Sequence, residues 1–289
     1  MSEFLSLTLS GLALGGVYAL IALGYTMVYG IAKMLNFAHG DIIMVGAYSI
    51  LVTFMTCGMP VWACMIIAII FCTILGIVIE KVAYKPLRGA SPLAILITAI
   101  GVSYLMESIV YLIFGSAPKN VVLFESLQGN QTATALITLG VAVAIMIALV
   151  LFIDFTKIGK AMRAVSEDRG AAQLMGINVN FVIMITFAIG SALAAVAAIF
   201  WLMKTPLVTY TMGSLPGIKA FSAAVIGGIG SIPGAMIGGI LMGLIETYCD
   251  AVPGLSSFTM AVEFAILVVI LLVRPSGLLG KAKREKVLF

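Results

Sequence analysis

The stretch DFTKIGKAMRAVSEDRGAAQLMGINVN, residues 154–180, is a long polar interruption in the middle of an otherwise apolar chain. A segment with so many charged side chains cannot lie in hydrocarbon, and its lysines and arginines outnumber its acidic residues. Because short basic loops stay on the cytoplasmic side of a membrane, we assign this stretch to the cytoplasm. The orientation of every other segment follows from this assignment.

Within the stretch, the residues after Asp168 predict a short helix. Asp168 is a suitable N-cap, good helix formers follow it, and Gly176 can end the helix in the left-handed conformation. Ala171, Ala172 and Met175 would then share one face. The residues alone leave two interpretations open. The helix either lies among lipid headgroups as a linker or docks a cytoplasmic protein, whose close approach the small side chains permit.

The composition excludes a soluble globular protein. Of 289 residues, 62% are hydrophobic and 10% are charged, whereas soluble domains are about 25% charged, and the mean hydropathy is +1.21. At roughly 20 residues per crossing, we predict an all-α polytopic membrane protein with about eight to nine transmembrane segments in one domain, residues 1–289. No phosphate-binding Gly-x-x-x-x-Gly-Lys-Ser/Thr motif is present, and no room remains for an ATPase domain.

Charge and cysteine content point to no chemistry beyond transport. The net charge of +4 is explained by basic cytoplasmic loops and a basic C-terminal tail, so we expect no nucleic-acid partner. The cysteines lack metal-ligand spacing and are expected to be packing residues. We therefore predict no catalytic residue, no metal and no cofactor.

The expected crossings are separated by short loops and rich in small residues. Gly11 and Gly15 in the first, and Gly239 and Gly243 in a later one, have the spacing that lets two helices approach closely. The crossing at 181–203 has so many small residues that it should be central in the bundle. The expected crossings cover residues 5–31, 42–56, 61–79, 93–114, 134–153, 181–203, 231–248 and 258–273.

Residues 32–41 form the first expected break between helices. They contain Asn36, His39 and Asp41, and His39 is the only histidine. Ionisable groups near membrane depth are costly and usually face a cavity or a partner, so these residues are candidates for a transport path. The alternative is that Asn36 or Asp41 caps a helix start, with His39 at the headgroups.

Residues 213–234 form a second break. Residues 217–230 must cross the membrane, yet a helix of that length reaches only about 21 Å of the roughly 30 Å required. We therefore expect that this segment is not one ordinary helix. Unwound backbone at membrane depth lines cavities or is buried in protein, and short segments interrupted by Gly or Pro indicate transport sites. A re-entrant structural loop or a tight hairpin is the alternative.

Four motifs, in order, resemble the LivH family, the membrane permease subunits of bacterial ABC importers for branched-chain amino acids. They are LNFAHG at 35–40; GKAMRA at 159–164, continuing to Ala171-Ala172 and Gly176-Ile177-Asn178; KAF at 219–221, continuing to GGIGSIPGA at 227–235; and Arg274-Pro275-x-Gly277-Leu278. The resemblance covers essentially the whole chain. Related permeases for amides or urea have similar sequences, so the substrate is less specifically indicated than the family.

The resemblance implies that residues 154–180 are the loop that docks on the ATPase. Its core matches Ala171, Ala172 and Gly176, with Gly159 and Arg163 in the same loop. Gly170 stands where many importers have a glutamate, so no salt bridge is carried over from that position. The implied partners are a second permease subunit, either a relative or a second copy, two ATPase subunits and an extracytoplasmic amino-acid-binding protein. Membrane lipid surrounds the assembly.

The mechanism we predict is ATP-driven alternating access in the bacterial cytoplasmic membrane, with the C-terminus in the cytoplasm. The predicted path residues are Asn36, His39, Asp41, Lys219, Gly227, Gly228 and Gly230. An ion-coupled carrier acting alone, with Asp41, Glu107 or Glu263 as its ion site, and a passive channel remain as rivals. The role of Glu246 is left open.

Overall fold

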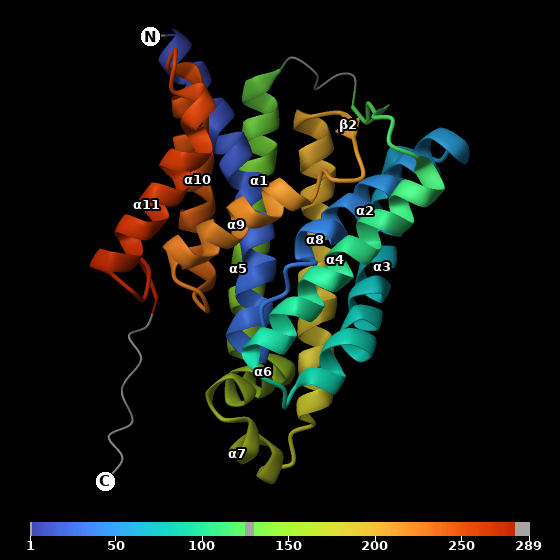
Figure 1. The fold of residues 1–289 in the computed structure, drawn as a ribbon, viewed down its shortest axis with the longest axis vertical. Coiled ribbons are helices and arrows are strands. Elements are labelled where there is room, and N and C mark those ends of the chain that lie inside the picture. Colours follow the sequence, from blue (N-terminus) through green and yellow to red (C-terminus); the bar gives the residue numbers. More distant parts are fainter. Residues whose placement is uncertain (1, 125–129, 281–289) are drawn as a thin grey trace.

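The computed structural model describes residues 2–124 and 130–280, and it confirms an all-α membrane protein (Figure 1). In this part of the chain, eight helices are long and apolar enough to cross a membrane, and a ninth, α9, is shorter. The predicted basic tail lies outside the described residues. The helices are α1 (Ser2–Ala32), α2 (His39–Leu51), α3 (Val61–Ile79), α4 (Pro92–Phe114), α5 (Gln131–Phe155), α6 (Lys157–Glu167), α7 (Arg169–Leu174), α8 (Val179–Lys204), α9 (Ser214–Gly227), α10 (Ile232–Ala251) and α11 (Thr259–Val273).

Short irregular turns extend several of these helices. Single π-helical turns follow α2 (Val52–Thr56) and α3 (Glu80–Tyr84), and 3₁₀ turns lie at Lys85–Leu87 and Ser256–Phe258. The start of α1 and the pair α6 and α7 lie at opposite ends of the bundle (Figure 1). Five helices that are long enough to cross, α1 to α5, separate the two, and an odd number of crossings places them on opposite sides.

Helices α1 and α10 pack through the glycines that the sequence singled out. A Cβ added at Gly15 would lie 2.7 Å from the Cα of Ile240, and one at Gly239 would lie 2.4 Å from the Cα of Ala19. Gly243 lies equally close to the backbone of Gly15. Glycine is required at these positions because backbone meets backbone. We call this contact the α1–α10 seam.

Helix α8 is central, as its small residues predicted. Its buried positions include Gly190, Ser191 and the alanines at 194, 195, 197 and 198, and it packs against α1, α2 and α3. Small side chains let three helices reach it at once. The lipid-facing helices α4, α5 and α11 are buried along far less of their length.

The predicted break at 32–41 is present, but its details differ. Helix α1 ends at Ala32, residues 33–36 have no regular structure, and α2 begins at His39. The N-cap position of α2 is Ala38, which makes no side-chain cap hydrogen bond. The capping interpretation of Asn36 and Asp41 was therefore wrong, and so was the placement of His39 at the headgroups, because its side chain is buried.

The prediction for the second break was wrong in form. Residues 214–227 make one uninterrupted helix, α9, which runs obliquely across the bundle instead of unwinding (Figure 1). A helix of 14 residues is nevertheless too short to cross the membrane by itself, as its length predicted. The turn residues 210–213 precede α9, and its C-terminal end is followed by a turn at Gly228 and Gly230, both with positive φ.

The starts of the two short helices α2 and α9 touch each other. A Cβ added at Gly213 would lie 2.1 Å from the carbonyl oxygen of Gly40, and one at Gly217 would lie 2.9 Å from the Cα of Gly40. Side chains would hold these two backbones apart. The contact joins residue 40 to residues 213–217, so it links the two halves of the chain inside the bundle.

A two-stranded antiparallel ribbon joins the halves a second time, at the end of the bundle opposite α7 (Figure 1). Strand β1 (Lys119–Asn120) pairs with β2 (Leu207–Val208), with Lys119 opposite Val208. The ribbon was not predicted from the sequence, because two-residue strands carry no periodicity.

Candidate functional site

The polar stretch 154–180 folds into two helices instead of the one predicted. The hydroxyl of Thr156 caps α6 by accepting from the amide of Gly159 at 2.9 Å. The carboxylate of Asp168 caps α7 by accepting from the amide of Ala171 at 3.0 Å, which confirms its predicted role. Gly176 ends this unit with a φ of +82°, as predicted.

The exposed face of α7 differs from the predicted one. Ala172 is buried against its own chain, while Ala171 is exposed. The prediction that both alanines face a partner was therefore wrong, since residues one apart on a helix point in different directions. The most exposed apolar side chains are Leu174, at 90%, and Met175, at 82%. We call these two residues the α7 tip.

The other two predicted loop residues, Gly159 and Arg163, both lie in α6. Gly159 is buried, and a Cβ there would lie 2.4 Å from the Cα of Ile153, so it lets α6 fold back on the end of α5. Arg163 forms an exposed ion pair with Asp154 at 2.8 Å. Exposed pairs of this kind contribute little to stability.

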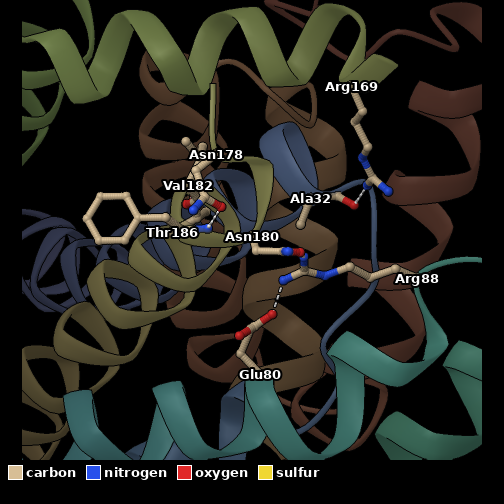
Figure 2. Close-up of polar contacts among 9 residues, drawn as sticks. Ala32, Glu80, Arg88, Arg169, Asn178, Asn180, Val182 and Thr186 are labelled. Carbon is tan, nitrogen blue, oxygen red and sulfur yellow. Dashed lines mark hydrogen bonds and ion pairs between the residues drawn. The ribbon is translucent and has the colours of Figure 1, made fainter. Parts of the chain in front are cut away.

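Two arginines connect α7 and the adjoining loops to the bundle (Figure 2). Arg169, in the first turn of α7, donates to the backbone carbonyl oxygen of Ala32 at the end of α1. Arg88 donates to the carboxylate of Glu80 and to the side-chain oxygen of Asn180 near the start of α8. The hydrogen bond of Arg169 thus joins α7 to the end of α1, the helix that precedes the break at 33–36.

A cavity of about 420 Å³ opens beside these arginines. We call it the arginine cavity. It is bordered by α7, by Arg88 and by the first turn of α8. Its lining residues are Arg88, Arg169, Gly170, Gln173, Gly176, Ile177, Asn178, Val179, Asn180 and Ile183.

The structure places the candidates of the first break deep inside the bundle. Asn36 accepts a hydrogen bond from the hydroxyl of Tyr84 at 2.8 Å. The ring of His39 packs edge-on against Tyr25, with centroids 4.7 Å apart. The side-chain oxygen Oδ1 of Asp41 is buried and accepts no hydrogen bond from the described residues. Asp41 thus keeps an unsatisfied acceptor at membrane depth, a costly arrangement that is typical of functional sites.

Lys219 lies apart from that group, in a buried ionic cluster that joins four helices. Its ammonium lies 2.9 Å from Oε2 of Glu246 on α10 and 3.2 Å from Oε1 of Glu263 on α11. The hydroxyl of Tyr18 on α1 donates to Glu246 at 2.6 Å. We call these four residues the Lys219 cluster. Charges inside a membrane protein pair in this way because an isolated charge there is costly.

The remaining predicted path residues have packing contacts. Gly227 lies against the carbonyl oxygen of Gly234 at the start of α10, and Gly228 lies against Gly277 and Gly280. Leu278 and Leu279 donate backbone hydrogen bonds to Ile226 and Gly227. Gly230 has a φ of +97° in the turn that follows α9. The turn at 228–230 still lies close to the first break, because Ile229 and Asn36 line the same small cavity and a Cβ added at Gly30 would lie 3.3 Å from the Cα of Gly230.

The comparisons with known proteins identify the family. A family model described as the permease component of a branched-chain amino acid transport system matches residues 7–271. The chain belongs to this permease family. The permease BraD of Pseudomonas aeruginosa is 41% identical over 99% of this chain and 98% of its own length, and LivH of Salmonella typhimurium is 42% identical over 98% of each. Both are named as permeases of high-affinity branched-chain amino acid transport systems.

The family extends to more distant relatives. A probable branched-chain amino acid permease of Methanocaldococcus jannaschii is 32% identical over 90% of this chain. Among solved structures, PsaBC from Streptococcus pneumoniae, in complex with an antibody fragment, matches with a TM-score of 0.51 at 15% identity, over 92% of this chain and 91% of that one. At that identity the likeness concerns the fold alone.

Sequence reasoning missed the two features that join distant segments. Neither Glu80 nor Arg88 was predicted to be a functional residue, and the hydrogen bond from Arg88 to Asn180 on α8 spans 92 positions of the chain. Glu263 was considered as the ion site of a carrier, the role of Glu246 was left open, and Lys219 was predicted as a path residue. The signal that was available is that a buried lysine in a membrane protein needs acidic partners.

Proposed function

We propose that this chain is a permease subunit of an ATP-driven importer of branched-chain amino acids in the bacterial cytoplasmic membrane. The observation that carries the proposal is the 41–42% identity, over nearly the whole chain, to permeases of that transport system. The assembly would contain a second permease, two ATPase subunits and an extracytoplasmic binding protein. The ends of the bundle at α7 and at the C-terminus would face the cytoplasm.

The geometry of α7 supports a coupling role for this helix. The α7 tip exposes two apolar side chains, and apolar side chains exposed on a polar surface are typical of protein contacts. Behind the tip, Arg169 and the buried Ala172 hold α7 to the bundle. We infer that closure of the ATPases moves α7, and that α1 carries this motion to the break at 33–36.

The path that we propose runs past the contact between the starts of α2 and α9. Asn36, His39 and Asp41 lie in or next to the break, and Glu107 on α4 accepts a hydrogen bond from Ser214 in the first turn of α9. Helix α9 is too short to span, and a short element of this kind can shift without unfolding a crossing. Lys219 and the glycines at 227–230 hold α9 in place.

The experiment is accumulation of radiolabelled leucine in cells that carry this chain and its partner subunits. Gly176→Arg places a bulky charge beside the α7 tip, and we expect it to abolish accumulation while the protein reaches the membrane in normal amount. Gly115→Arg is the matched control, because Gly115 also has a positive φ and nothing within 4 Å of an added Cβ, but it follows α4 at the other end of the bundle.

The energy source separates the proposal from its rivals. Uptake should persist when an uncoupler removes the proton gradient and ATP is maintained, and it should stop when the ATPase is inactivated. An ion-coupled carrier would give the reverse result, and a passive channel would show no accumulation against a gradient. Competition by leucine, isoleucine and valine, and not by urea or short amides, is the expected substrate pattern.

A further inference from the structure

The arginine cavity has positive charge on its walls and lacks acid. Two guanidinium side chains, Arg88 and Arg169, contribute to its lining, whose remaining residues are apolar or carry neutral amides. The first turn of α8 also borders it, and the start of this long helix carries a partial positive charge from its aligned peptide dipoles. The cavity thus combines three features that attract an anion.

Only part of this charge is compensated within the chain. Arg88 pairs with Glu80, but its Nε is buried and has no hydrogen-bond partner among the described residues. Arg169 takes part in none of the ion pairs formed within residues 2–124 and 130–280, and its hydrogen bond goes to a neutral carbonyl. Partial burial, and secondarily the charge of Arg88, lower the pKa of Arg169. An anion between the two guanidinium groups would relieve this repulsion.

The position of the cavity indicates the source of the anion. Gly170, Gln173 and Gly176 of the α7 unit form part of its wall. The two residues of the α7 tip lie between Gln173 and Gly176 in the chain. A protein surface that covers the two exposed apolar side chains therefore lies beside the cavity, since Gln173 and Gly176 on either side of the tip line it. Apolar contact flanked by a charge pair is the usual composition of a protein interface.

We propose that the arginine cavity receives an acidic side chain of the ATPase subunit, whose carboxylate binds between Arg88 and Arg169. This inference rests on the proposed function and adds to it the chemistry of the partner surface. The apolar α7 tip would supply contact area, and the carboxylate would fix the direction in which α7 is pushed or pulled. Gly170 leaves room for this side chain, because it adds none of its own to the wall.

The test uses a zero-length carbodiimide, which joins a carboxylate to a primary amine as an amide with loss of water. Arg169→Lys places an amine in the cavity, and the complete complex of permease and ATPase is then treated with the reagent. We expect a new covalent permease–ATPase product, in which peptide mass spectrometry locates the link between position 169 and one Asp or Glu of the ATPase. The wild-type complex, with arginine at this position, should lack that link.

A second amine position keeps the test decisive. If the Arg169→Lys complex does not assemble, Gln173→Lys carries the amine in the same cavity with Arg169 retained. The inference is overturned if an assembled complex of either variant gives links from these positions only to acids of the permease itself, or none at all. Leucine uptake and its dependence on ATP would be unchanged by that outcome, so the proposed function would stand.

Binding measurements supply the quantitative arm. Arg169→Gln should weaken ATPase binding at least about tenfold, as expected when one partner of a buried charge pair is removed. Lys160→Gln removes an exposed positive charge from the neighbouring α6 and should change binding less than twofold. The assay is repeated in nanodiscs of neutral lipid and of anionic lipid. An effect of Arg169→Gln that is seen only with anionic lipid would assign the cavity to a lipid headgroup and overturn the inference.

Discussion

The α1–α10 seam and the surface around α7 differ in the size and the exposure of their side chains. In the seam, glycines bring two backbones into contact over several turns, and no side chain can be added. Around α7, side chains are long, charged or exposed, and a cavity remains open beside them. A seam of this kind moves as one body, whereas the α7 surface can accept a partner. In the proposed function, the α7 surface would receive the motion of the ATPases and the seam would transmit it.

The largest effect should come from a side chain placed in the seam. In Gly239→Leu, the added Cβ would lie 2.4 Å from the backbone of Ala19, so α1 and α10 must separate, at a cost above about 4 kcal/mol. We expect almost no monodisperse permease after detergent extraction, measured by size-exclusion chromatography. Gly140→Leu on α5 is the control, because nothing lies within 4 Å of its added Cβ. Equal yields from the two variants would refute the rigid seam.

The next largest effect concerns the Lys219 cluster, which ties α9 to the helices of the seam. Lys219→Met leaves Glu246 and Glu263 without their cation, and we expect a loss of about 3–5 kcal/mol in the free energy of unfolding. Lys219→Met combined with Glu246→Gln and Glu263→Gln removes the buried charges together and should recover much of this loss. Thermal unfolding in one detergent measures both. A single variant as stable as the triple one would contradict the role of charge pairing.

The α7 tip should respond in binding and not in folding. The double variant Leu174→Asp and Met175→Asp is expected to weaken ATPase binding by about 2 kcal/mol, or roughly thirtyfold. The melting temperature of the isolated permease should stay the same, since both side chains are exposed. Exchanging the two residues, Leu174→Met with Met175→Leu, keeps the tip apolar and serves as control. If the acidic variant binds the ATPase as tightly as the wild type, the α7 tip is not part of the interface.

The smallest effect should come from the cap of α7. Asp168→Ala removes the acceptor for the amide of Ala171 and should cost about 1 kcal/mol. Asp168→Asn retains a capping oxygen and should cost less. Hydrogen exchange of the α7 amides is the measurement, with faster exchange expected for the alanine variant alone. The same exchange rate in both variants would mean that the cap does not set the stability of α7.

The features that the sequence predicted correctly depend on neighbouring residues. Crossing limits follow from apolar length, the start of α7 from the carboxylate of Asp168, and its end from Gly176. The glycine spacing also predicted close helix packing, although it could not say that Gly15 meets Gly243. These signals are local, so one sequence suffices to read them.

The features that the sequence did not predict depend on residues far apart in the chain. The oblique path of α9 is fixed by Gly40 and by the acids that hold Lys219, and neither contact leaves a local pattern. The arginine cavity likewise needs Arg88 and Arg169 to meet across the bundle. For Ala172, the pattern gave the helix but not its rotation, which is set by the neighbours that bury it.

The short length of α9 affects how the protein inserts into the membrane during its synthesis. A helix of 14 residues with a lysine in it is too short and too polar to enter the bilayer as an independent segment when it leaves the ribosome. Its acidic partners belong to α10 and α11, which are synthesised afterwards. We therefore expect α9 to stay at the membrane surface until α10 and α11 have been synthesised. Premature termination within α11 would then leave the second half of the bundle unassembled.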